Sequence, residues 1–68
     1  MKIKVVDTIN KRTSVMDPRD FLLVVTNWFP GATPEVEETL GELANMVTAP
    51  LWTADIHALA GTVGLKIS

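Results

Sequence analysis

The single histidine, His57, belongs to the residue type that most often transfers protons in enzymes. A catalytic histidine needs a carboxylate that orients it and a nucleophile beside it. Asp55 lies two residues earlier on a predicted helix, and side chains at that spacing diverge. The chain has no cysteine, and no serine lies in a nucleophile-elbow pattern. We therefore expect a surface histidine, no catalytic residue and no enzymatic activity.

Four glutamates, at positions 35, 37, 38 and 42, fall in one predicted helix. Glu38 and Glu42 are four residues apart and share a face. A metal site would need further ligands, and one histidine without any cysteine supplies too few. We expect no metal and no cofactor. Glu38 and Glu42 are predicted to be solvated, and to act only as a charged face that docks on a basic partner.

The basic residues are concentrated at the N-terminus. Residues 1–19 contain five basic and two acidic side chains, whereas residues 20–68 contain one basic and six acidic ones. Four of the cations fit a two-stranded basic arm like those of dimeric ribbon proteins that read DNA, namely Lys2, Lys4, Lys11 and Arg12. We favour instead a solvated edge strand, whose lysines protect it from unwanted pairing. The net charge of −2 argues against nucleic-acid binding as the main activity.

Apolar side chains are more numerous than so small a core can cover. Leu23 is predicted to point outward from a polar helix face, and Leu51 and Trp52 fall in a loop between helices. Tryptophan is enriched among the residues that dominate protein interfaces. We therefore select Leu23, Leu51 and Trp52, together with Glu38 and Glu42, as candidate protein-binding residues.

Residues 55–65 resemble the first helix and turn of the helix-turn-helix motif of DNA-binding proteins, with Ala60 at the close approach and Gly64 in the turn. The resemblance implies a recognition helix after the turn. Only Lys66, Ile67 and Ser68 follow, so the part that would read bases is missing. The pattern also fits an ordinary helix that ends at a glycine.

The N-terminal elements are predicted as a strand or hairpin followed by a helix. Residues 2–9 begin with strand-like alternation, Asn10 and Lys11 predict a turn, and residues 12–16 predict a returning strand. Asn-Lys is a weaker hairpin signal than Asn-Gly, because only the asparagine readily tolerates positive φ. Asp17 and Pro18 then predict a helix that runs to Phe29. Its segment FLLVV also fits a buried strand, and the Asp-Pro start favours the helix.

The clearest element is the helix predicted over residues 33–47. Thr33 is its expected N-cap and Pro34 its first residue, and apolar side chains recur on one face. Gly41 lies beside this apolar stripe, where it would let another backbone approach closely. A third helix is predicted to start after Thr53 and to end at Gly64, and residues 65–67 could add a short strand beside the first.

These elements predict a single small α+β domain over residues 1–68: an N-terminal β-strand or hairpin followed by three short α-helices, and so mostly helical. No apolar run is long enough for a membrane span and no signal-peptide pattern occurs, so we expect a cytoplasmic protein. A core this small without disulfides requires either very regular packing or self-association, of which a homodimer is the form we consider.

The leading functional hypothesis is a small non-enzymatic module that binds a larger protein and modulates or inhibits it. Compact chains of this kind without cysteine are common among accessory proteins of phages and mobile elements. One alternative is a dimeric DNA-binding transcriptional regulator that uses the basic N-terminal ribbon. Another is an assembly subunit of a larger particle.

Overall fold

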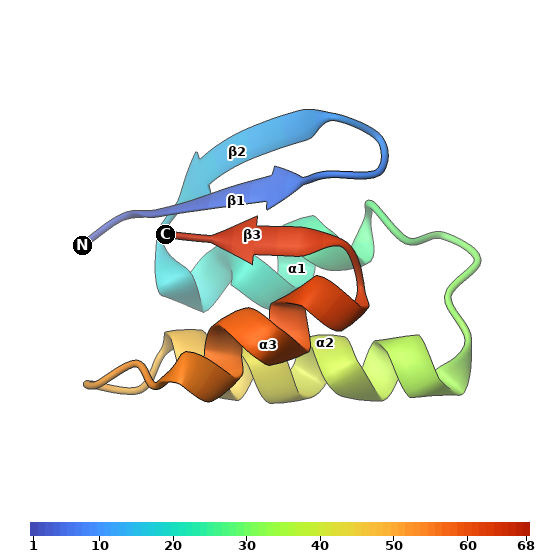
Figure 1. The fold of residues 1–68 in the computed structure, drawn as a ribbon. Coiled ribbons are helices and arrows are strands. Elements are labelled where there is room, and N and C mark those ends of the chain that lie inside the picture. Colours follow the sequence, from blue (N-terminus) through green and yellow to red (C-terminus); the bar gives the residue numbers. More distant parts are fainter.

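The computed structural model describes residues 1–68, which form a three-stranded antiparallel sheet and three α-helices (Figure 1). This confirms the predicted α+β class. The element order is β1 (Ile3–Asp7), β2 (Arg12–Met16), the 3₁₀ turn η1 (Pro18–Asp20), α1 (Phe21–Thr26), α2 (Pro34–Val47), α3 (Ala54–Thr62) and β3 (Leu65–Ile67). The predicted hairpin and three helices are present, but the order does not end with the helices, because the chain returns to the sheet as β3.

The sheet has the strand order β2-β1-β3, so the N-terminal strand lies in its centre. Ile3 is opposite Met16 in β2, and Val5 is opposite both Ser14 in β2 and Ile67 in β3. Alternate residues of β1 are buried, because successive side chains of a strand point to opposite faces. One face of the sheet therefore packs on the hydrophobic core, and the other face is open to solvent.

The hairpin loop differs from the predicted two-residue turn at Asn10 and Lys11. Asp7 pairs with Arg12, so residues 8–11 form a four-residue loop, and the positive φ of 55° falls on Lys11 rather than on Asn10. The cause is the Asp7 carboxylate, which accepts hydrogen bonds from the backbone N–H groups of Ile9 and Asn10 and from the Asn10 side-chain amide. These bonds wrap the loop around the carboxylate.

The helix predicted from Pro18 to Phe29 is shorter and divided. Asp17 does cap the start, since its carboxylate accepts the Arg19 N–H at 3.1 Å, but the first turn is the 3₁₀ turn η1. The α-helix α1 ends at Thr26. At this end, the side chains of Thr26 and Asn27 donate hydrogen bonds to the carbonyl oxygens of Leu22 and Leu23. Such side-chain bonds compete with the backbone bonds that would continue the helix.

Helix α2 has the bounds expected from the sequence. The Thr33 hydroxyl accepts the Val36 N–H at 3.3 Å, and Pro34 is the first helical residue. Leu40, Leu43 and Val47 of the predicted stripe are fully buried. The close approach expected at Gly41 is wrong, because a Cβ built there meets nothing within 4 Å.

Helix α3 leads into β3 through a glycine turn. The helix follows Thr53 as predicted, and Gly64 ends it with a φ of +76°, which a glycine adopts without strain. Residues 65–67 then pair antiparallel with β1, which confirms the predicted C-terminal strand. The helix-turn-helix resemblance therefore fails in this structure, since the turn is followed by a strand and not by a recognition helix.

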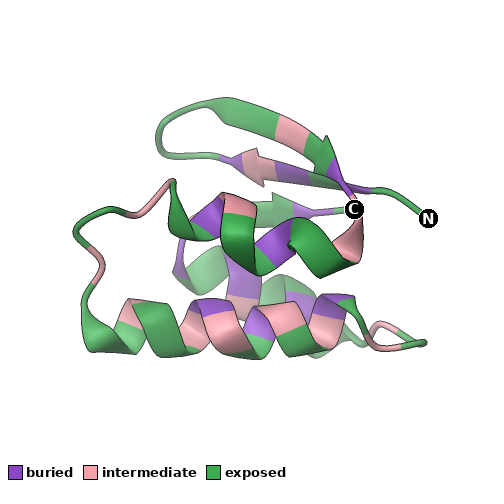
Figure 2. Ribbon diagram, turned by 180° about the vertical axis from the view of Figure 1, so that it is seen from behind, coloured by how far each residue is buried: buried purple, intermediate pink, exposed green.

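The helices lie on one side of the sheet, with α1 and α3 nearer to it and α2 farther away (Figure 1). Figure 2 shows that the buried segments face the space between these layers. One cluster of 13 buried apolar residues fills this space, contributed by the strands and by all three helices. Its largest fully buried member is Phe21 of α1. The molecule contains no helix with the length and apolarity that crossing a membrane requires.

Candidate protein-binding groove

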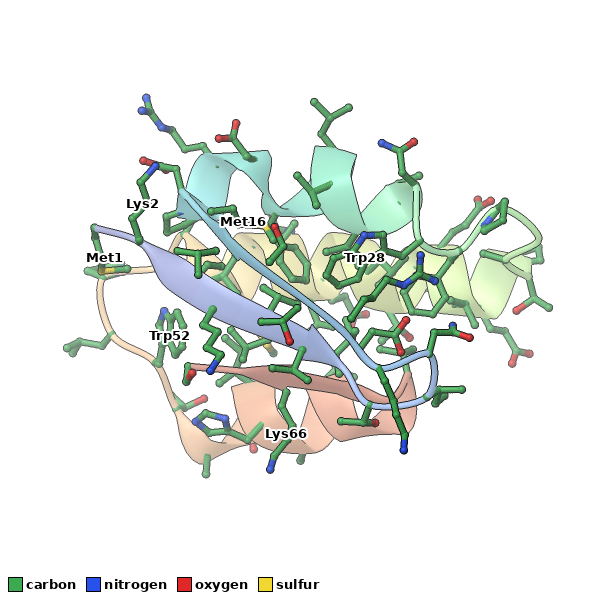
Figure 3. All side chains as sticks on the ribbon, turned by 90° about the horizontal axis from the view of Figure 1, so that it is seen from above. Met1, Lys2, Met16, Trp28, Trp52 and Lys66 are labelled. Atoms are coloured by element: carbon green, nitrogen blue, oxygen red, sulfur yellow. The ribbon has the colours of Figure 1, made fainter.

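A groove of about 670 Å³ lies at the end of the molecule where β1 begins. Its walls come from the N-terminal residues 1–3, the junction of β2 with η1, the loop between α2 and α3, and Ser68. The groove contains Leu51 and Trp52, two of the predicted binding residues. Figure 3 shows Met1, Lys2 and Trp52 at this same end of the molecule.

Trp52 is held in place as part of the groove wall. Its indole Nε1–H donates to the carbonyl oxygen of Val47 at 3.3 Å, and the half-buried ring meets His57 edge-on at 6.5 Å between centroids. The loop residue before it, Leu51, is 83% exposed. The loop therefore presents one free apolar side chain beside one anchored aromatic ring.

The opposite wall of the groove carries the charges. Asp17 forms an ion pair with Arg19, with 3.4 Å between the carboxylate oxygen and Nε, and both residues line the groove together with Lys2. The hydrogen bond from the backbone N–H of Arg19 is the main cause that lowers the pKa of Asp17, and the positive charges of Arg19 and Lys2 lower it further. Asp17 thus stays ionised and partnered, and the side-chain charge around the groove is positive by one unit.

The structure does not bring all the predicted binding residues together. Leu23 lies on α1, is 73% exposed and does not line the groove. Glu38 and Glu42 lie on the exposed side of α2, and they too are separate from the groove. The five candidates therefore divide among three places: the groove, the outer side of α1 and the acidic side of α2.

The basic residues of the predicted ribbon are dispersed as well. Lys4 lies on the open face of the sheet, Lys11 lies in the hairpin loop, and Lys2 lies near Asp17. Arg12 points back to the protein, where its Nε is 3.0 Å from a carboxylate oxygen of Asp7. Lys4 shares a second, smaller groove with Lys66 and His57. The four residues do not form one continuous basic strip.

Asp7 is the important polar residue that the sequence reasoning left without a role. Its side chain is 1% exposed, and both of its carboxylate oxygens accept hydrogen bonds. Burial is the largest influence on the Asp7 pKa and raises it, but hydrogen bonds from Asn10, Arg12 and Ile9 outweigh it and hold the pKa below its ordinary value. The sequence did contain a signal for this role, because the alternation of the first strand places Asp7 on the same, inward side as Ile3 and Val5.

No group of three or more histidine, cysteine, aspartate or glutamate side chains is placed to hold a metal ion. Comparison with protein-family models, with curated proteins and with solved structures finds no match to this chain. The geometry itself therefore carries the functional argument. What it offers is an apolar, weakly basic groove with an exposed leucine at one side.

Proposed function

We propose that this chain is a non-enzymatic module that binds a larger protein through the groove beside Leu51 and Trp52 and thereby modulates or inhibits that protein. The observation that carries the proposal is the exposure of Leu51, 83%, next to the anchored ring of Trp52. An accessory role in a phage or mobile element is the setting that we propose for it.

The energetics favour contact at this loop. Covering a leucine fully contributes about 1.5–3 kcal/mol. Trp52 is already fixed by its bond to Val47, so a partner that covers it has little side-chain entropy to remove. An aromatic anchor surrounded by apolar and charged groups is typical of the residues that dominate protein interfaces.

The proposal is tested by photo-crosslinking in cells that make the protein. A photoreactive amino acid at position 51 is expected to capture one discrete larger protein. The same group at Asn45, which is exposed on α2, is the matched control and should not capture it. If both positions give the same products, the groove is not the binding site.

Substitution then separates the groove from the other exposed leucine. Leu51→Asp and Leu23→Asp introduce the same charge at two exposed positions of different faces. The first is expected to abolish capture by a crosslinker placed at Thr53, beside the loop, and the second to leave it intact. Equal loss in both variants would contradict a site at Leu51, provided that circular dichroism shows both to be folded.

The DNA-binding alternative has less support. Its cations are dispersed, and Arg12 is engaged with Asp7 and with the carbonyl of Trp28. A gel shift at low salt with Lys2, Lys4 and Lys11 intact, against the triple alanine variant, tests it directly. Sequence-independent binding that these substitutions remove would revive this alternative.

A further inference from the structure

The outer edge of β2 carries backbone groups that have no partner. In an antiparallel pair each residue directs its N–H and C=O to the same side. Lys4 bonds with Ser68, and Thr8 donates to Gly64, so the even residues of β1 face β3. The odd residues of β1 therefore bond with Arg12, Ser14 and Met16 of β2.

It follows that Thr13 and Val15 direct their N–H and C=O groups away from β1, toward the open edge. Neither residue takes part in any of the backbone bonds outside the regular elements. Both are exposed, Val15 to 64%. No strand pairs with β2 on that side, and the element nearest to this edge is α1, which lies below it (Figures 1 and 3).

The edge also lacks the features that keep edge strands from pairing. Lysine, proline or a bulge usually protects such a strand. β2 reads Arg-Thr-Ser-Val-Met, with one charge at its first residue and with residues in its middle that favour strands. An unprotected edge of five residues is suited to pair with another strand.

An exposed apolar surface lies beside this edge. Helix α1 runs alongside β2 on the helical side of the sheet (Figures 1 and 3). Its Leu22 is 43% exposed and its Leu23 is 73% exposed. Val15 adds a third exposed apolar side chain at this edge, on the open face of the sheet, because it alternates with the buried Met16.

We propose that a second copy of this chain covers this edge, by antiparallel pairing of β2 with β2 about a two-fold axis at Ser14. Thr13 then bonds with the partner's Val15, and Val15 bonds with the partner's Thr13. The two sheets join into one continuous sheet, and the two α1 helices meet beneath the seam, where Leu22 and Leu23 are covered.

Charge favours this occupant and this register. Arg12 comes opposite the partner's Met16, and Lys11 of the hairpin loop and the partner's Asp17 flank the seam at each end. No like charges face one another between the paired strands. Thr13 and Val15 form a cross-strand pair of two side chains that favour strands. The pairing uses neither Leu51 nor Trp52. The dimer therefore goes beyond the proposed function, and a test that disproves the dimer leaves the proposed function standing.

Sedimentation equilibrium on the full chain tests the dimer. The wild type is expected to sediment as a dimer, and Val15→Lys, which places an edge-protecting charge at the seam, to weaken association at least about tenfold. Leu51→Lys is the matched control, with the same charge change at an exposed apolar residue outside the seam. A monomeric wild type, or equal association of Val15→Lys and wild type, would overturn the proposal.

A single-cysteine variant checks the register independently. The chain has no cysteine, so Ser14→Cys introduces the only thiol. Ser14 faces the partner's Ser14 in a pair without hydrogen bonds, with Cα atoms about 4.5 Å apart, within disulfide range. Mild oxidation is expected to give a disulfide-linked dimer rapidly. Asn45→Cys should cross-link much more slowly, and equal rates would show that a different surface pairs or that collisions alone account for the product.

Discussion

The guanidinium carbon of Arg12 lies 5.4 Å from the centroid of the Trp28 ring, above its face. The same side chain pairs with the buried Asp7 at 3.0 Å and donates to the carbonyl of Trp28 at 3.2 Å. Arg12 thus joins the hairpin to the segment that follows α1. These contacts therefore hold the segment after α1 against the sheet.

Arg12→Ala is expected to lower the free energy of unfolding by about 2 kcal/mol. The substitution leaves the Asp7 carboxylate buried with only its loop hydrogen bonds and removes the cation above Trp28. Urea unfolding followed by tryptophan fluorescence measures the change. Lys4→Ala, at an exposed lysine, should change it by less than about 0.5 kcal/mol. Similar values for the two variants would show that the Asp7 contact contributes little.

Stability should fall in acid because of Asp7. The pKa of Asp7 is lower in the folded protein than its ordinary value of 3.8, so its contribution is complete above that value and is lost as the pH falls through the folded pKa. Urea titrations across this range should show Asp7→Asn less stable than wild type near neutrality, with the difference shrinking in acid. Asp17 has a lowered pKa too, so the variant keeps part of the acid sensitivity. A gap between the proteins that does not depend on pH would contradict the assignment.

Gly64→Ala is expected to destabilise the protein by about 1–2 kcal/mol, because an alanine must adopt a φ of +76° there. Its Cβ would also lie 2.6 Å from Cδ1 of Ile9, whose side chain is 70% exposed and free to move. The double variant with Ile9→Ala separates the two causes in thermal unfolding. If it restores wild-type stability, the contact matters and the backbone angle does not.

Gly41→Ala is expected to stabilise the protein by about 0.5–1 kcal/mol. The glycine lies inside α2, and a Cβ added there meets no atom within 4 Å, so alanine only reduces the backbone freedom of the unfolded chain. The midpoint of thermal unfolding should rise. A fall would mean that this part of α2 contacts something absent from a single copy.

Local signals account for much of the fold. Helix α2 was predicted with its bounds because Thr33, Pro34 and the apolar stripe depend only on neighbours in the sequence. The hairpin loop and η1 were predicted less well, since Asp7 and the backbone partners there set the geometry. Of the candidate site, Leu51 and Trp52 were predicted to lie together because they are adjacent in one loop. That Leu23 lies apart from them depends on how α1 packs, which the sequence does not show.

The sequence by itself determined the α+β class, the starts of α2 and α3 and the inward side of β1, because caps and periodicity act over a few residues. Only the tertiary structure decided that β1 lies between β2 and β3, that Arg12 forms an ion pair with Asp7, and that Trp52 donates a hydrogen bond to Val47. These relationships join distant residues, and their free energy depends on burial that no local pattern records. The open edge of β2 is of the same kind, since a strand is an edge only when its neighbours are known.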